Sequence, residues 1–168
     1  QIRNILKSSQ STVIFVTHDQ EEALFMGDRL AVFNQGKIEQ IGEPEVIFHD
    51  SQTRFVAAFM GDSDFVVGKA TPSGIQTELG LLTQEHSFRN NSDVEIAVRA
   101  DDVDFQLQNP GNGKIINRFF QGAFNFYRIK LDSGAIVHVY KLHTEIFNPG
   151  ERVWTYFNAG HPLKIFLQ

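Results

Sequence analysis

The stretch Val13-Ile14-Phe15-Val16-Thr17-His18-Asp19-Gln20-Glu21-Glu22-Ala23-Leu24 decides how the N-terminal part of this sequence is interpreted. Its first four residues are apolar and mostly β-branched, a pattern typical of a strand that is buried on both faces of a parallel sheet. A short polar turn follows, and Asp19 with Glu22 has the spacing of a capping box that opens a helix. The stretch therefore predicts a buried strand over residues 12–16, a turn and a helix.

The sequence around this stretch predicts further short elements up to residue 61. They are the end of a helix at Ile2, Ile5 and Leu6, a hairpin of residues 29–33 and 37–41 around Asn34-Gln35-Gly36, a helix that begins at Pro44, and a helix over residues 53–60. Gly61 closes the last of these helices.

The pattern changes after Asp62, where short alternating strands separated by turn residues replace the helical spacing. We expect nine strands, over residues 65–70, 75–79, 94–99, 103–107, 114–119, 126–131, 136–140, 152–157 and 163–167. A boundary near residue 62 therefore separates residues 1–61 from an all-β domain of residues 62–168.

The β region also contains a loose internal duplication. Gly68-Lys69 opens one unit and Gly113-Lys114 opens the next. Each unit closes with a similar pair of strands, residues 93–98 followed by 105–107 in the first and residues 151–156 followed by 165–167 in the second. Two such units predict a pair of small OB-type barrels.

Composition limits the possible function classes. The chain has 168 residues, of which 42% are hydrophobic and 21% charged, as expected of a folded protein. The formal net charge of −5 argues against nucleic acid, because a surface that follows phosphates needs a basic excess. The absence of cysteine excludes disulfides and thiolate metal sites. No apolar run approaches the roughly 18 to 20 residues that span a bilayer.

His18 is the candidate catalytic residue of the opening stretch. It follows the predicted buried strand and precedes the capped helix, and ligands of open α/β sheets bind beyond the carboxyl ends of such strands. An imidazole in this place can donate a hydrogen bond to an anionic oxygen. It can equally satisfy loop carbonyls, and position alone leaves both interpretations open.

Residues 12–61 resemble the end of the ATPase subunits of ATP-binding-cassette (ABC) importers, in the branch that handles sugars, polyamines and ferric iron. The matching motifs, in order, are Thr17-His18-Asp19-Gln20-Glu21-Glu22-Ala23-Leu24, Asp28-Arg29-Leu30-Ala31-Val32, Asn34-Gln35-Gly36-Lys37-Ile38-Glu39-Gln40-Ile41-Gly42, Pro44-Glu45 and Phe55-Val56-Ala57-Ala58-Phe59-Met60-Gly61. Their number and order make the resemblance specific. It implies that residues 1–61 are the C-terminal remnant of an α/β P-loop ATPase domain.

The same resemblance implies a role for His18 as the switch-loop histidine, which contacts the γ-phosphate of ATP in the intact parent. It also implies ATP and Mg²⁺ as the parent's cofactors. The implied partners are a second identical ATPase subunit and membrane permease subunits, through which the protein would lie in the cytoplasm at the inner membrane. It identifies no further cofactor-binding residue in this chain.

The motifs that would hold ATP are missing from the sequence. It has no G-x-x-x-x-G-K-[ST] phosphate loop, no ABC signature motif and no Walker B carboxylates. We therefore expect the chain to be an excised fragment of an import ATPase that binds no cofactor and is inactive by itself.

Residues 62–168 resemble the transport-associated OB (TOBE) domain that follows this ATPase branch. The matching residues are Gly61 with Asp64-Phe65, Val98-Arg99-Ala100-Asp101-Asp102-Val103 and Gly150-Glu151-Arg152-Val153-Trp154. The resemblance implies a regulatory or dimerisation domain, and the residues from Phe59 to Phe65 make ferric iron the expected cargo.

Two further patterns have alternative interpretations. A group of aromatic residues lies near basic residues in the sequence and could stack nucleic-acid bases, fill a barrel core or form a dimer contact. The aromatic residues are Phe119, Phe120, Phe124, Phe126 and Tyr127, and the basic ones are Lys114, Arg118, Arg128 and Lys130. The acidic net charge favours a protein with no nucleic-acid partner. Five further histidines lack metal-ligand spacing, so no metal site is expected: His49, His86, His138, His143 and His161. The alternative function is a self-standing OB-type module that binds a small oxyanion or nucleic acid.

Overall fold

The computed structural model describes Arg3, Ile5, Ser8 and residues 12–168, which form two compact units divided between Val56 and Ala57. Each unit is described by itself. The division falls inside helix α4 (Arg54–Gly61), a few residues before the boundary predicted at residue 62. Of the helix predicted at the N-terminus, Ile2 and Leu6 lie outside the described residues.

The first unit contains short helices and one hairpin. Its elements are α2 (Gln20–Met26), β1 (Leu30–Asn34), β2 (Lys37–Gly42), α3 (Pro44–His49) and the start of α4. The hairpin is confirmed, and Gln35 and Gly36 both have positive φ angles, as a two-residue type I′ turn requires. Buried Gln40 on β2 fixes the turn before α4, because its amide donates to the carbonyl of Asp50 and accepts from the backbone N–H of Gln52.

The strand predicted over residues 12–16 is wrong for this chain. The segment is irregular, and the side chains of Ile14 and Val16 are 89% and 88% exposed. A parallel strand needs a neighbour on each side and helices over its faces. Among the described residues, the first unit supplies only the antiparallel hairpin β1–β2, so the segment has nothing to pair with. The described residues therefore do not show the α/β sheet of a P-loop remnant.

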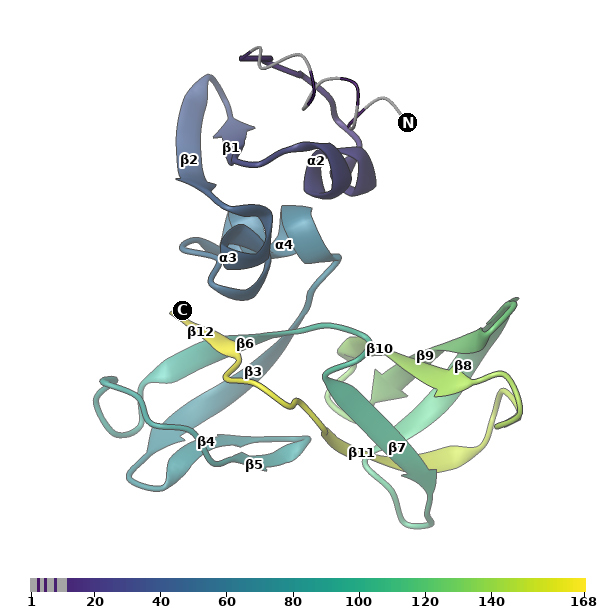
Figure 1. Ribbon diagram of the computed structural model, residues 1–168. Coiled ribbons are helices and arrows are strands. Elements are labelled where there is room, and N and C mark those ends of the chain that lie inside the picture. The colour runs from purple at the N-terminus through teal and green to yellow at the C-terminus, as the bar shows by residue number, and fades with distance from the viewer. Residues whose placement is uncertain (1–2, 4, 6–7, 9–11) are drawn as a thin grey trace. The chain divides into compact units, whose positions relative to one another are not determined.

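After the end of α4, the second unit consists of two five-stranded antiparallel sheets (Figure 1). Its strands are β3 (Asp64–Thr71), β4 (Gly74–Thr77), β5 (Gly80–Leu82), β6 (Asp93–Val98), β7 (Val103–Leu107), β8 (Gly113–Gln121), β9 (Phe124–Leu131), β10 (Ile136–Leu142), β11 (Arg152–Phe157) and β12 (Lys164–Leu167). All nine predicted strands are present, and β5 is the additional one.

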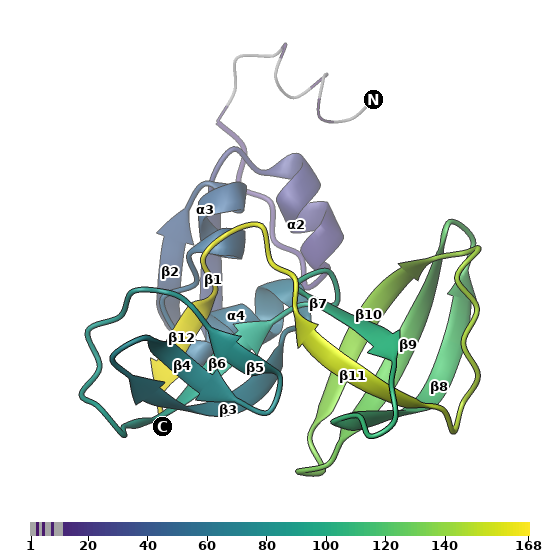
Figure 2. The same ribbon diagram turned by 90° about the horizontal axis from the view of Figure 1, so that it is seen from below.

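The two sheets have the same topology once one exchange is allowed. The strand orders are β12-β6-β3-β4-β5 and β7-β11-β8-β9-β10, so β3 to β6 correspond to β8 to β11. The fifth position is exchanged, because β7 follows the first repeat in sequence but pairs with β11, and β12 follows the second repeat but pairs with β6. Figures 1 and 2 show this as a late strand, β12, beside β6 and an early strand, β7, beside β11.

Both sheets curl into OB-type barrels, and polar contacts bridge the two edge strands of each sheet. In the first barrel, the Gln84 side chain donates to the carbonyl of Leu163 at 2.9 Å and accepts from its N–H at 2.8 Å, as a backbone partner would. In the second, the N–H of Tyr140 donates to the carbonyl of Ala100 at 2.8 Å. One hydrophobic core runs through both barrels and includes Val66, Ile96, Phe105 and Tyr127.

No helix within the described part of the chain combines the length and apolar character that a membrane crossing requires.

Candidate functional site

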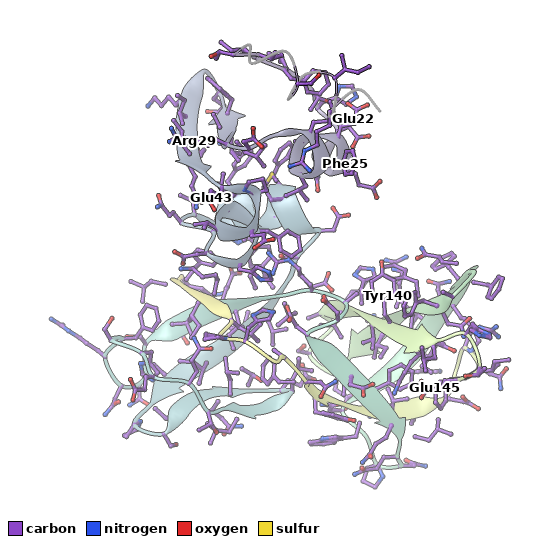
Figure 3. The ribbon with its side chains drawn as sticks, viewed as in Figure 1. Glu22, Phe25, Arg29, Glu43, Tyr140 and Glu145 are labelled. Carbon is purple, nitrogen blue, oxygen red and sulfur yellow. The ribbon has the colours of Figure 1, made fainter. Side chains whose placement is uncertain are left out.

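His18 lies in the bend that leads into α2, and its side chain is exposed. The helix start is held by the predicted cap: the Asp19 carboxylate accepts from the backbone N–H of Glu22 at 3.0 Å. The reciprocal half of the capping box is absent, because the Glu22 carboxylate, labelled on α2 in Figure 3, accepts from the Thr17 hydroxyl at 2.8 Å instead. The N–H of Asp19 donates to the same hydroxyl at 3.0 Å. These bonds fix the backbone on both sides of His18.

The local geometry leaves the His18 imidazole open toward a ligand supplied from elsewhere. The Asp19 carboxylate caps α2, and the Glu22 carboxylate accepts from the Thr17 hydroxyl. The phosphate loop that would cradle a nucleotide is absent from the sequence. The residues present fit ATP only in part: the His18 imidazole can donate one hydrogen bond, but the sequence contains no phosphate-binding loop.

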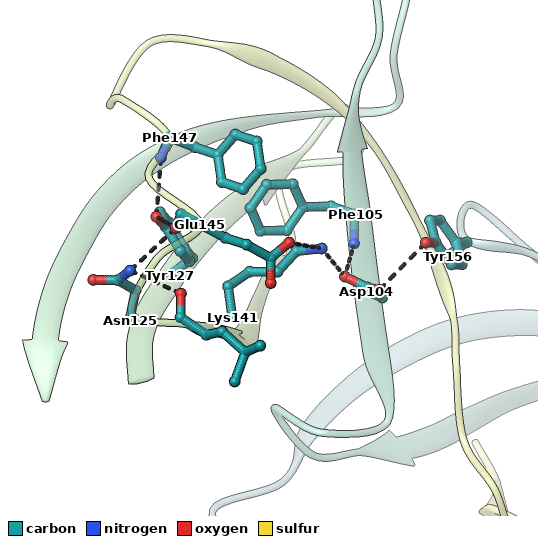
Figure 4. A network of polar contacts seen from close by, with 9 residues as sticks. Asp104, Phe105, Asn125, Tyr127, Lys141, Glu145, Phe147 and Tyr156 are labelled. Atoms are coloured by element: carbon teal, nitrogen blue, oxygen red, sulfur yellow. Dashed lines mark hydrogen bonds and ion pairs between the residues drawn. The ribbon is translucent and has the colours of Figure 1, made fainter. Parts of the chain in front are cut away.

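A network of polar contacts organises the second barrel (Figure 4). The Lys141 ammonium lies 2.6 Å from an oxygen of Asp104 and 3.6 Å from one of Glu145, over the rings of Phe105 and Phe147 at 4.9 and 5.9 Å. Burial by itself lowers the pKa of the Lys141 ammonium, but the hydrogen bond and charge of Asp104, followed by the charge of Glu145, raise the pKa overall. The amine is therefore an internal cation with its counter-charges supplied.

The same network holds the loop after β10 against the barrel. The Tyr127 hydroxyl donates to the carbonyl of Glu145 at 2.9 Å and accepts from the N–H of Phe147 at 3.0 Å. The fully buried Asn125 amide lies 3.1–3.2 Å from three carbonyls of that loop, those of Leu142, His143 and Glu145. Because every group here has a structural partner, the network fixes the loop and offers no reactive group.

Two aspartates tie distant parts of the second unit together. Asp64 on β3 accepts from the backbone N–H of His138 on β10 at 2.7 Å, and the Nδ1 atom of His138 lies 2.9 Å from the same carboxylate. Asp102, which is almost fully buried, accepts from the N–H of Arg99 at 2.9 Å and lies 3.0 Å from Nε2 of His161. Sequence reasoning missed both pairs, since residues 74 positions apart, as Asp64 and His138 are, leave no local pattern.

Burial dominates the titration of these carboxyl groups. It raises the pKa of Asp64 above its ordinary value, and the hydrogen bond and charge of His138 offset this only in part. Burial likewise raises the pKa of Asp102, against the opposing hydrogen bond from the Arg99 N–H. His138 and His161 lie at ion-pair distance from Asp64 and Asp102, respectively. Desolvation nevertheless raises the pKa values of the two carboxyl groups by more than the histidines lower them.

These raised pKa values predict a pH dependence of stability. Between the ordinary aspartate pKa of about 3.9 and the raised folded value, the folded protein binds more protons than the unfolded chain, so the free energy of unfolding falls as pH rises. Urea unfolding of Asp64→Asn should therefore show a shallower loss of stability between pH 4 and pH 7 than the unchanged chain. Glu85→Gln, at an exposed position of the same unit, is the matched control. An identical pH slope for Asp64→Asn would contradict the assignment.

One open pocket of about 480 Å³ lies in the first barrel, between residues 71–74 and 83–90. His86 lines it and lies with Nε2 2.9 Å from the carbonyl of Thr71. Hydroxyl and amide groups predominate, Glu85 adds an acid, and the lining residues include no lysine or arginine. The pocket therefore offers no lysine or arginine charge to a ligand.

The five histidines considered for metal binding lie apart. Among residues 12–168 and the three described before them, no three histidine, aspartate or glutamate side chains gather into a possible metal site. His138 and His161 instead face single aspartates, and His86 faces a carbonyl.

Comparison with known proteins identifies a matching domain family and similar proteins. Residues 96–163 match the TOBE domain family. The chain is 34% identical over 160 residues to the spermidine/putrescine import ATP-binding protein PotA of Trichormus variabilis, covering 86% of this chain and 42% of that protein. The PotA proteins of Clostridium acetobutylicum (36% over 137 residues; 79% of this chain, 38% of the relative) and Onion yellows phytoplasma (34% over 151 residues; 86% and 34%) are similar.

The chain is similar over most of its length to ABC importer ATP-binding subunits, and residues 96–163 match the TOBE domain. It spans less than half the length of these curated relatives. Among solved structures, the cytoplasmic molybdate-binding protein ModG is similar with a TM-score of 0.48 and 12% identity, over 62% of this chain and 96% of that one.

Proposed function

We propose that this chain serves as the C-terminal region of the ATP-binding subunit of an importer whose two ATPase subunits act on membrane permease subunits. The observation that carries the proposal is the extent of the match: the Trichormus variabilis relative aligns with 86% of this chain, well beyond residues 96–163 that match the TOBE domain family. The fixed backbone around His18 and the uncovered apolar segment 13–16 are what a segment completed by further ATPase residues would have.

Polyamines are the proposed cargo class, because the relatives carry spermidine/putrescine import in their names. Ferric iron, the cargo expected from the sequence, has no support among them. The proposed location is the cytoplasmic face of the membrane, through the permease subunits. ATP and Mg²⁺ are proposed cofactors of the whole subunit, in which His18 supplies a hydrogen-bond donor and residues outside this chain supply the phosphate cradle.

A graft tests this proposal. Residues 12–168 would replace the matching C-terminal part of the Trichormus variabilis PotA subunit in cells that lack their own polyamine uptake. We expect ATP-dependent spermidine import by the graft, with no ATP turnover by the 168-residue chain alone. A graft that folds and joins the permease but does not import spermidine would refute the proposed function, as would turnover by the isolated chain.

A further inference from the structure

Two short segments carry the chain between the barrels of the second unit. The first connecting segment, residues 99–102, leads from β6 in the first barrel to β7 in the second. The second connecting segment, residues 158–163, leads from β11 in the second barrel back to β12 in the first. The N–H of Asn158 donates to the carbonyl of Asp102 at 2.8 Å, so the two segments are in contact. This contact therefore affects the positions of both exchanged strands.

The side chain of Asp102 lies at the centre of the contact and is 3% exposed. Its Oδ2 atom accepts from the N–H of Arg99 at 2.9 Å, and its own N–H donates to the carbonyl of Arg99 at 3.0 Å, which closes the turn of the first segment. The Oδ1 atom lies 3.0 Å from Nε2 of His161 in the second segment. A carboxylate that is buried this deeply needs hydrogen bonds or an opposite charge. The His161 ring is therefore a partner that the buried oxygen requires.

Both ring nitrogens of His161 face oxygen atoms. Nε2 lies 3.0 Å from the Asp102 carboxylate, and Nδ1 lies 3.0 Å from the carbonyl of Pro162. A carbonyl and an ionised carboxylate accept hydrogen bonds and donate none, whereas a neutral imidazole carries a single N–H. Both contacts are hydrogen bonds at the same time only if the pair holds one additional proton. That proton lies either on the ring, beside an ionised Asp102, or on Asp102, which then donates to Nε2.

The pair formed by Asp64 and His138 has no such requirement for its contact. Nδ1 of His138 lies 2.9 Å from the Asp64 carboxylate, and a neutral ring with its proton on Nδ1 can donate to it. The need for an additional proton therefore follows from the geometry around His161 and not from the pairing of a histidine with an aspartate as such.

The charged groups around the pair are Arg99 and Asp101. Burial raises the pKa of the Asp102 carboxyl, and the charge of Asp101 adds to this, while the N–H and the charge of Arg99 act in the opposite direction. Burial also lowers the pKa of the Arg99 guanidinium. The His161 side chain is 35% exposed, so a proton on the pair can exchange with solvent.

We propose that Asp102 and His161 form a proton-dependent latch, in which one proton held by the pair near neutral pH keeps the two connecting segments together. Loss of the proton leaves one N–H for two accepting oxygens, so one of the two hydrogen bonds is lost. Because the second segment leads directly into β12, the strand that completes the first barrel is then held less firmly. The two positions of the proton belong to a single protonated state of the pair.

The pH dependence of stability of the 168-residue chain tests the latch. Above the ordinary histidine pKa of about 6.5, a folded pair that keeps its proton binds more protons than the unfolded chain, so the unfolding equilibrium constant rises with pH. In urea unfolding, we expect this constant to rise about three- to tenfold more between pH 6.5 and pH 8.5 in the unchanged chain than in Asp102→Asn. The asparagine amide can accept from Arg99 and donate to a neutral His161 ring, so it keeps both contacts without the additional proton.

His161→Gln is the second variant, because a glutamine amide can donate to Asp102 without titrating. It should show the same shallow pH dependence as Asp102→Asn. His143→Gln, at an exposed histidine of the same unit, is the matched control and should keep the pH dependence of the unchanged chain. Near-ultraviolet circular dichroism of Trp154 would confirm that the second unit of each variant is folded.

Hydrogen exchange at the N–H of Asn158 locates the effect in the contact between the segments. After correction for the intrinsic exchange rate, its protection should fall at least about threefold between pH 6.5 and pH 8.5 in the unchanged chain and stay constant in Asp102→Asn. If neither variant folds, this measurement on the unchanged chain decides the question, and constant protection rejects the latch.

Three results of the unfolding experiment would overturn the inference. They are an equal rise of the unfolding constant in the unchanged chain and in both variants, a constant that falls as the pH rises, and a control variant that loses the pH dependence as completely as Asp102→Asn does. The latch lies within the second unit, so these results leave the importer function to be decided by the graft.

Discussion

Removal of residues 163–168 is expected to unfold the first barrel, although these residues follow the second barrel in sequence. The deletion removes all of β12, whose residues pair with Val94 to Ala97 on β6, and the buried core side chain of Leu163. It also leaves the Gln84 amide without both of its backbone partners. Loss of one buried leucine costs about 2–5 kcal/mol, so loss of the whole strand consumes a large part of the roughly 5–15 kcal/mol that stabilises a domain.

Hydrogen exchange and urea unfolding measure this effect. We expect the truncated chain to lose amide protection in β6 and β3 before β8 and β9, with a fall of at least about 4 kcal/mol in the free energy of unfolding. Leu167→Ser, at an exposed position that leaves the β12 backbone in place, should change the stability by less than about 0.5 kcal/mol. Preserved protection at residues 94–97, with loss confined to β11, would contradict the exchanged topology.

His18→Ala in the PotA graft is expected to lower ATP turnover by roughly 10² or more while ATP binding is retained. The proposed reason is loss of a hydrogen-bond donor at the oxygens where negative charge increases during phosphoryl transfer. The backbone around position 18 should be unaffected, because it is fixed by Thr17, Asp19 and Glu22 rather than by the imidazole.

Turnover and nucleotide affinity should be measured together for this variant. His143→Ala, at an exposed histidine of the TOBE domain, is the control and should match the unchanged graft. A His18→Ala graft with near-normal turnover would show that this histidine is an ordinary loop residue. Loss of nucleotide binding together with turnover would assign it to binding rather than to the chemical step.

Local patterns predicted the second unit well because its strands are defined by neighbouring residues. The bounds of β7 and β11 were predicted without error, and alternation located the others within a few residues. Strand β5 (Gly80–Leu82) was missed because a strand of three residues is too short to show alternation. The exchange of β7 and β12 could not be predicted, because both strands follow similar hairpin-like patterns. Nothing in these patterns indicates which sheet each strand joins.

In the first unit, local sequence patterns predicted one element incorrectly. Residues 12–16 have a strong strand composition, yet their conformation depends on neighbouring strands that the described chain does not supply. The cap at Asp19 was predicted correctly because its hydrogen bond spans only three residues. The pairs Asp64–His138 and Asp102–His161 depend on tertiary contact alone, so residue spacing contained no sign of them.

The exchanged fifth strands also bear on how this domain can be inherited and rebuilt. A gene segment that encodes a single repeat would yield four strands of one barrel together with a strand that belongs to the other, so the heritable unit is the pair. The exchange is the intramolecular counterpart of domain swapping, with the segments between β6 and β7 and between β11 and β12 as its crossover points. Recombination between members of the family would therefore preserve folding when it exchanges both repeats together, and would separate strands from their sheets when it cuts between them.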